Sequence, residues 1–141
     1  MAAIPRQTVM REAATSFAIN AMLSLAFFAL LYGLTPRLLA WGAPDRLALD
    51  FVPQSIAVAL MSALVPCLIL RRRLRLPIGI QPIVLRASLF ALLGGLVGAA
   101  MAALCASLPP IGWTTALLLK LGYGGTLGAA ITTVCIGRLT A

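Results

Sequence analysis

Residues 87–108 read "ASLFALLGGLVGAAMAALCASL", and this stretch decides the fold because it contains no charged side chain. An α-helix rises 1.5 Å per residue, so about 20 apolar residues cross the ~30 Å hydrocarbon layer of a bilayer. Three further apolar runs of this kind occupy residues 15–34, 53–70 and 113–136. The sequence therefore predicts an all-α integral membrane protein. Residues 1–141 are expected to form one domain of four transmembrane helices, arranged as two antiparallel hairpins with short loops.

The amino-acid composition excludes a water-soluble globular domain. Hydrophobic residues make up 62% of the chain and charged residues 10%, whereas a soluble domain carries about 25% charged residues. Because so few charges cannot cover the surface, most of that surface must face lipid. The net charge of +8 does not indicate nucleic-acid binding, because the arginines lie between apolar runs and few aromatic residues accompany them.

The residue types that catalysis and metal binding need are scarce. The chain has no histidine, which removes the commonest general base and the commonest zinc ligand. The three cysteines, Cys67, Cys105 and Cys135, lie far apart inside apolar runs and show no CxxC spacing. Neither a disulfide framework nor a thiolate metal site is predicted from that pattern. We therefore expect a protein without catalytic activity, cofactor or metal.

The distribution of arginine predicts the orientation in the membrane. Eight arginines lie in the amino-terminal tail, the loop after the second apolar run and the carboxy-terminal tail, and two lie in the loop after the first run. Lys and Arg in short loops favour the cytoplasmic side, so both termini are expected in the cytoplasm. This pattern is typical of a bacterial inner membrane. The first loop, residues 35–52, is amphipathic in its middle and is expected to lie in the interface as a short helix.

The densest cluster of positive charge directly follows the second apolar run. Orientation alone explains it, because it holds this loop on the cytoplasmic side. Each arginine near an anionic leaflet also adds about 1 kcal/mol of attraction, so contact with anionic lipids accompanies the topology. A dedicated lipid or partner site is the alternative interpretation. The residues of this cluster are Arg71, Arg72, Arg73 and Arg75.

The third and fourth apolar runs carry small residues at four-residue spacing, which places them on one face of each helix. Helices in lipid associate where such residues let their backbones approach closely. We expect one face to pack the third helix against the fourth. The remaining small surface is then free to bind another membrane subunit or a second copy of the chain. The glycines concerned are Gly94, Gly98, Gly124, Gly125 and Gly128.

Polar side chains within the first two helices are expected to serve packing. Ser16, Asn20 and Ser24 share one face of the first helix and should point into the bundle, where they find partners on other helices. Pro66 lies inside the second helix and cannot donate to the carbonyl of Ser62. The sequence therefore predicts a bend in this helix near Pro66.

Lys120 is the one lysine of the chain, seven residues after Trp113 and therefore about 10 Å inside the fourth helix. A lysine at the centre of a spanning helix costs about 2.5–3.5 kcal/mol on insertion scales. Asp50 and Gln54 lie near the same membrane boundary, and Tyr123 lies one helical turn further along, so these three are its candidate partners. Lys120 is either a lysine that snorkels toward the outer headgroups or is structurally paired, and so fixes the height and rotation of the fourth helix, or it is a ligand or coupling site, because ionisable residues within a membrane are functional candidates.

Two functions follow from these patterns. The first is a small accessory or assembly subunit, or a self-associating bundle, that acts by helix–helix association in the lipid bilayer and has no catalysis of its own. The alternative is a small oligomeric transporter in which Lys120 and Asp50 lie near a substrate or ion pathway. The lack of any acidic residue within the apolar runs stands against a proton-coupled carrier.

Overall fold

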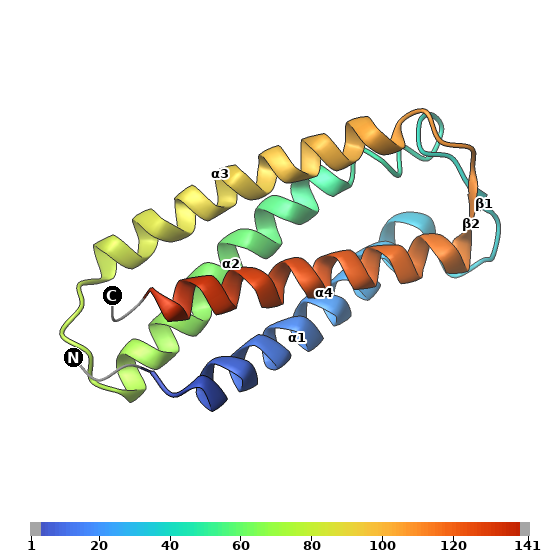
Figure 1. Cartoon of the computed structure of the whole chain (residues 1–141). Coiled ribbons are helices and arrows are strands. Elements are labelled where there is room, and N and C mark those ends of the chain that lie inside the picture. Colours follow the sequence, from blue (N-terminus) through green and yellow to red (C-terminus); the bar gives the residue numbers. More distant parts are fainter. Residues whose placement is uncertain (1–3, 139–141) are drawn as a thin grey trace.

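The computed structural model describes residues 4–138, which form four long α-helices and one short antiparallel β-ribbon (Figure 1). All four helices are long and apolar enough to cross a membrane, as the sequence predicts. The elements in chain order are α1 (Arg6–Tyr32), β1 (Leu38–Leu39), α2 (Phe51–Arg73), α3 (Ile80–Cys105), β2 (Ile111–Gly112) and α4 (Trp113–Gly137).

Two of the helices begin earlier than their apolar runs. α1 starts at Arg6 instead of near residue 15, and α3 starts at Ile80 instead of near residue 87. Pro82 lies in the first turn of α3, where a helix tolerates proline because the missing N–H has no intrahelical partner there. The first turns of α1 are polar and so lie outside its apolar run, whereas in α3 Pro82 and Arg86 interrupt the apolar pattern before residue 87.

The β-ribbon joins the two loops at one end of the bundle, which we call the ribbon end (Figure 1). The expected short helix in the middle of residues 35–52 is absent: residues 35–50 consist of β1, turns and irregular backbone, and residues 51–52 already belong to α2. Asp45 explains the difference: its carboxylate accepts the backbone N–H of Ala40 (2.9 Å) and pairs with Arg37 (2.7 Å). The Arg37 guanidinium and the Ala40 N–H hold the pKa of Asp45 below its usual value. These contacts hold residues 40–45 in a turn. Pro44 lies in this segment and would interrupt a helix there.

The helices do not pair in the order that the sequence analysis expects. α3 packs along α2, and α4 packs along α1 and also contacts α2, whereas α3 and α4 do not pack together over the described residues. α4 therefore lies between its two partners, with α3 on the far side of α2. A row of small residues shows that some backbone comes close, but it does not identify which helix supplies that backbone.

Each glycine face has a different partner from the one expected. A Cβ at Gly98 would lie 2.5 Å from the carbonyl oxygen of Phe51 in α2, and one at Gly94 would lie 2.7 Å from Ala59. On α4, Gly124, Gly125 and Gly128 face the side chains of Ser24, Phe17 and Asn20 in α1. The glycine faces are thus filled within the chain.

The polar face of α1 points into the bundle, which confirms the prediction for Ser16, Asn20 and Ser24. The Asn20 amide donates to the hydroxyl of Ser62 in α2 at 3.0 Å. The Ser62 carbonyl, which Pro66 leaves without its helical donor, accepts the hydroxyl of Thr132 in α4 at 3.1 Å. α2 thereby continues through Pro66, and the Ser62 carbonyl has a hydrogen-bond donor. The bend near Pro66 stays a prediction.

Candidate functional site

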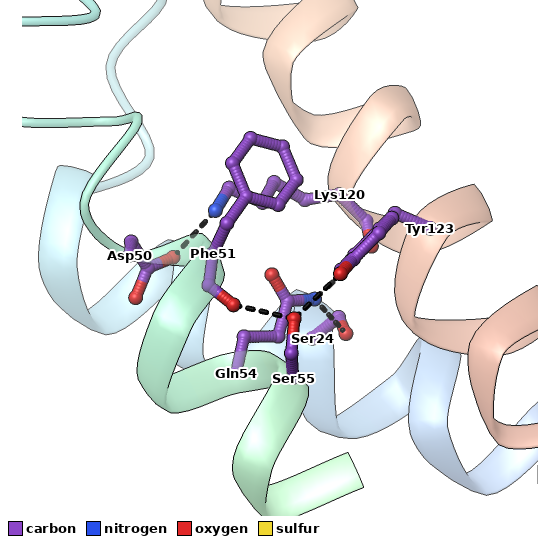
Figure 2. A network of polar contacts seen from close by, with 7 residues as sticks. All are labelled: Ser24, Asp50, Phe51, Gln54, Ser55, Lys120 and Tyr123. Atoms are coloured by element: carbon purple, nitrogen blue, oxygen red, sulfur yellow. Dashed lines mark hydrogen bonds and ion pairs between the residues drawn. The ribbon is translucent and has the colours of Figure 1, made fainter. Parts of the chain in front are cut away.

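Lys120 is buried in the protein interior and forms an ion pair. Only 1% of its surface is exposed, and its ammonium nitrogen Nζ lies 3.0 Å from Oδ2 of Asp50 (Figure 2). The same nitrogen lies 3.7 Å from the centre of the Phe51 ring, a distance typical of a cation–π interaction. Lys120 is therefore held by residues at the start of α2.

The local structure at the start of α2 makes Asp50 available to Lys120. Asp50 directly precedes Phe51, the first residue of the helix, and its side chain makes no capping hydrogen bond to α2. A carboxylate at this position is also favoured by the positive end of the helix dipole. Because the Asp50 side chain is 22% exposed, it reaches the ribbon end while its partner is enclosed.

Gln54 lies one turn further along α2 and connects three helices. Its amide nitrogen donates to the hydroxyl of Ser24 in α1 at 2.9 Å and to the backbone carbonyl of Lys120 in α4 at 3.3 Å. A carbonyl can only accept, so this contact fixes which end of the amide is the nitrogen. Gln54 therefore hydrogen-bonds the backbone carbonyl of Lys120. It does not bind the Lys120 ammonium, contrary to the expectation from the sequence.

Tyr123 also differs from expectation, because it pairs with α2 instead of with the ammonium. Its hydroxyl hydrogen-bonds the hydroxyl of Ser55, which in turn donates to the carbonyl of Phe51 (Figure 2). The Tyr123 ring meets the Phe51 ring edge to face, with centroids 4.9 Å apart. Phe51, which the sequence analysis missed, thus supplies the aromatic face for Lys120. The signal in the sequence that could have identified Phe51 is its position directly after Asp50, a candidate partner of Lys120.

Two buried polar groups at this site lack a hydrogen-bond partner among the residues that the structure describes. They are the Lys120 ammonium, beyond its ion pair, and the amide oxygen Oε1 of Gln54. A buried polar group without a hydrogen bond costs about 1–3 kcal/mol. The Asp50 carboxylate at 3.0 Å still holds the Lys120 ammonium, so of these two groups Gln54 Oε1 is the one that has no polar partner in the described residues.

Lys120 and Gln54 both line a pocket of about 240 Å³ between α1 and α2, which we call the upper pocket. The Lys120 nitrogen and Gln54 Oε1 are themselves enclosed by other atoms. It exists because α1 and α2 contact each other at few points, since each packs chiefly on another helix. Its lining includes the buried residues Asn20, Ser24, Phe28, Val58 and Lys120, together with Leu23, Phe27, Asp50, Pro53, Gln54, Ala57 and Met61.

A second pocket of about 150 Å³ continues between the same helices toward the end opposite the ribbon. It shares Asn20, Leu23 and Met61 with the upper pocket and reaches Glu12, in the second turn of α1. We call the two together the α1–α2 groove. Ser16, Asn20 and Ser24 lie on the face of α1 that borders the groove, but they are buried and hydrogen-bonded within the protein, so the surface of the groove is mainly apolar.

The arginine cluster at the end of α2 lies away from this groove. The guanidinium of Arg71 hydrogen-bonds the carbonyl of Ile78 and so closes the α2–α3 loop, while Arg72, Arg73 and Arg75 are exposed. Their contact with anionic lipids stays a prediction.

Comparisons with protein-family models, with curated proteins and with solved structures find no match to this chain. The functional argument therefore depends on the site itself.

Proposed function

We propose that this chain is a small membrane carrier, without catalysis, that binds its substrate in the upper pocket at Lys120. The observation that supports this proposal is the buried ion pair between Lys120 and Asp50, two residues that line the upper pocket together with Gln54. The continuation of the pocket as a groove toward Glu12 supports movement of the substrate as well as binding.

Retention of a bound molecule tests this function. Wild-type protein that is gently extracted from its native membrane is expected to carry a non-covalent ligand, detected by native mass spectrometry. Lys120→Met is expected to lower the occupied fraction about tenfold or more, because it removes a charged hydrogen-bond donor from the site. Leu119→Met is the matched control, since it places the same side chain at a neighbouring position outside the pocket. Equal retention by both variants, or none by the wild type, would contradict the proposal.

The carrier is proposed to lie in a bacterial inner membrane with both termini in the cytoplasm. The support is the excess of arginine in the tails and in the α2–α3 loop. With this orientation the ribbon end faces outward, and the upper pocket lies nearer the outer leaflet.

Cysteine labelling checks this orientation. The exposed positions Gly42, near the ribbon, and Pro77, in the α2–α3 loop, are suited to single cysteine substitutions, because the three native cysteines are buried. In intact cells a membrane-impermeant maleimide is expected to label Gly42→Cys at least several-fold more than Pro77→Cys. Permeabilised cells should label both equally. The reverse pattern in intact cells would place the termini outside.

An assembly subunit is the second candidate function. The glycine faces that the sequence offers to a partner helix are filled within the chain, which weakens the argument for this candidate. One observation still favours it: over the described residues α3 packs chiefly on α2, and Ala99 and Ala103, which follow Gly95 at four-residue spacing, are exposed. That surface would let a helix of another subunit or a second copy approach closely. A second protein present in equal amount after gentle extraction would favour this candidate.

A further inference from the structure

We infer that Cys67 and Cys135 form a redox-active thiol pair, which a quinone dissolved in the bilayer converts into a disulfide between α2 and α4. The inference goes beyond the proposed carrier function and does not depend on it, because neither cysteine lines a pocket of the α1–α2 groove. Three features carry it: the contact between the two thiols, the packing of α2 on α4 that holds them together, and the apolar surroundings, which select the oxidant.

The thiols of Cys67 and Cys135 hydrogen-bond each other, although the two residues belong to different helices. Both are free and buried, with 4% and 6% of their surfaces exposed, and both belong to one cluster of buried residues. Two cysteines can form a disulfide only where the backbone already holds their side chains close together. Thiols in contact meet this condition, which the spacing of the cysteines in the sequence does not reveal.

α2 and α4 hold the two thiols at the same height in the bundle. Both helices run away from the ribbon end (Figure 1), so residues at matching heights keep a nearly constant separation along the chain. Ser55 and Tyr123 hydrogen-bond across this interface at a separation of 68 residues, and Cys67 and Cys135 have the same separation. The packing of two long helices therefore brings the thiols together, so their contact does not depend on a loop.

The surroundings of the pair favour a lipid-soluble oxidant. The other buried residues of its cluster are alanine, leucine and isoleucine, and both cysteines lie in helices that are long and apolar enough to cross a membrane. A charged oxidant such as glutathione disulfide would have to leave water to reach the sulfur atoms, which costs several kcal/mol or more. A quinone is a two-electron oxidant that is already dissolved in the hydrocarbon.

The α1–α2 groove provides the approach to Cys67. Pro66, the residue directly before it, lines the second pocket, whose lining also includes Val65 and Ile69, 38% and 41% exposed. A molecule that enters this pocket from the lipid therefore reaches the residue next to Cys67. Because Pro66 has no N–H, α2 lacks one of its own helical hydrogen bonds here, which favours local opening of the helix beside the thiol pair.

The reaction balances without a further reactant. Two S–H bonds break and one S–S bond forms, while the quinone takes up the two protons and two electrons and becomes a hydroquinone. A lipid-soluble dithiol reverses the step by thiol–disulfide exchange. The disulfide joins α2 to α4 toward the end opposite the ribbon. Because α4 contains Lys120 and α2 begins directly after Asp50, oxidation restrains the two helices that position this ion pair.

Counting free thiols after exposure to a quinone tests the inference. Reduced full-length protein in phosphatidylcholine nanodiscs is incubated with decylubiquinone, whose fully substituted ring accepts electrons without adding a thiol. The protein is then denatured, alkylated and analysed by mass spectrometry. Wild-type protein is expected to lose two of its three free thiols and to yield one cross-linked peptide pair that contains Cys67 and Cys135. The unfolding midpoint of the oxidised protein should rise by about 5 °C or more.

Serine variants connect the reaction to this pair. Cys67→Ser and Cys135→Ser should each keep both remaining thiols after treatment with the quinone. Cys105→Ser is the matched control, because Cys105 is also buried but belongs to the cluster of residues at the ribbon end. This variant should lose both of its remaining thiols. Should a variant fail to fold, the cross-linked peptides of the wild-type protein still decide.

Three results would overturn the inference. They are retention of all three thiols by wild-type protein, a disulfide that includes Cys105 or joins two copies of the chain, and oxidation by glutathione disulfide as fast as by the quinone. We expect the glutathione reaction to be at least about tenfold slower, because its charges oppose entry into the bilayer. None of these results changes ligand retention at Lys120, so failure of this inference is distinguishable from failure of the carrier function.

Discussion

Asp50→Asn is expected to destabilise the folded protein by about 3–5 kcal/mol, because it leaves a buried charge without its partner. Lys120 is 1% exposed, and no other carboxylate in the described residues lies within ion-pair distance of it. The Phe51 ring remains, but a ring face without the carboxylate offsets only part of the desolvation cost of an ammonium. Chemical or thermal unfolding in detergent measures the loss.

Replacing Lys120 instead of Asp50 is expected to lower the free energy of unfolding much less. Lys120→Met removes the buried charge itself and leaves Asp50, whose side chain is 22% exposed and reaches the ribbon end. Water at that end can solvate the carboxylate. The double variant Asp50→Asn, Lys120→Met should therefore recover most of the stability that Asp50→Asn alone loses, as a double-mutant cycle would show.

Asp45→Asn is the matched control for this experiment. Asp45 also forms an ion pair, but its partner Arg37 has a side chain that is 46% exposed, so an unpaired Arg37 remains solvated. We expect a clearly smaller loss than for Asp50→Asn. Equal losses for the two asparagine variants, or no recovery in the double variant, would show that the ion pair of Lys120 contributes little.

The pairing of Lys120 with Asp50 is readable from the sequence for a simple physical reason. Helices that cross a membrane have a fixed rise per residue, so the distance of a residue from the end of its apolar run gives its depth. Asp50 lies at the boundary and Lys120 about 10 Å inside it, a gap that a lysine side chain leaning toward the amino terminus of its helix can span. A buried ammonium needs a carboxylate, so the two are natural partners. Depth does not reveal rotation about the helix axis, which is why the sequence favours Tyr123 as a partner of the ammonium and does not indicate Phe51.

The groove could not have been predicted, because it results from a contact that is missing. The sequence indicates that Gly94, Gly98 and the α4 glycines mark close approaches, and the structure bears out the closeness at these positions. The sequence does not indicate that α3 approaches α2 and that α4 approaches α1. Only when these partners are known does it follow that α1 and α2 contact each other little and leave a pocket between them.

Gly98→Leu is expected to have the second large effect, which is loss of most of the folded protein. The Cβ of any residue at this position would lie 2.5 Å from the Phe51 carbonyl oxygen and 2.8 Å from the Val52 Cα. Both are backbone atoms of α2, so no side chain can rotate away, and α3 would have to move off the helix on which it packs. Even Gly98→Ala should lower the free energy of unfolding by about 1–3 kcal/mol, the usual cost of overpacking.

Gly122 provides the control, because a Cβ there would meet no atom within 4 Å. Gly122→Ala should be neutral or slightly stabilising, since alanine favours a helix over glycine by up to about 1 kcal/mol. The measurement is the fraction of monodisperse protein after extraction, together with its unfolding midpoint. Displacement of α3 would also disturb Phe51, so we expect Gly98→Ala to weaken ligand retention at Lys120 although it touches neither pocket. If Gly98→Leu were as stable as Gly122→Leu, the close packing of α3 on α2 would be wrong.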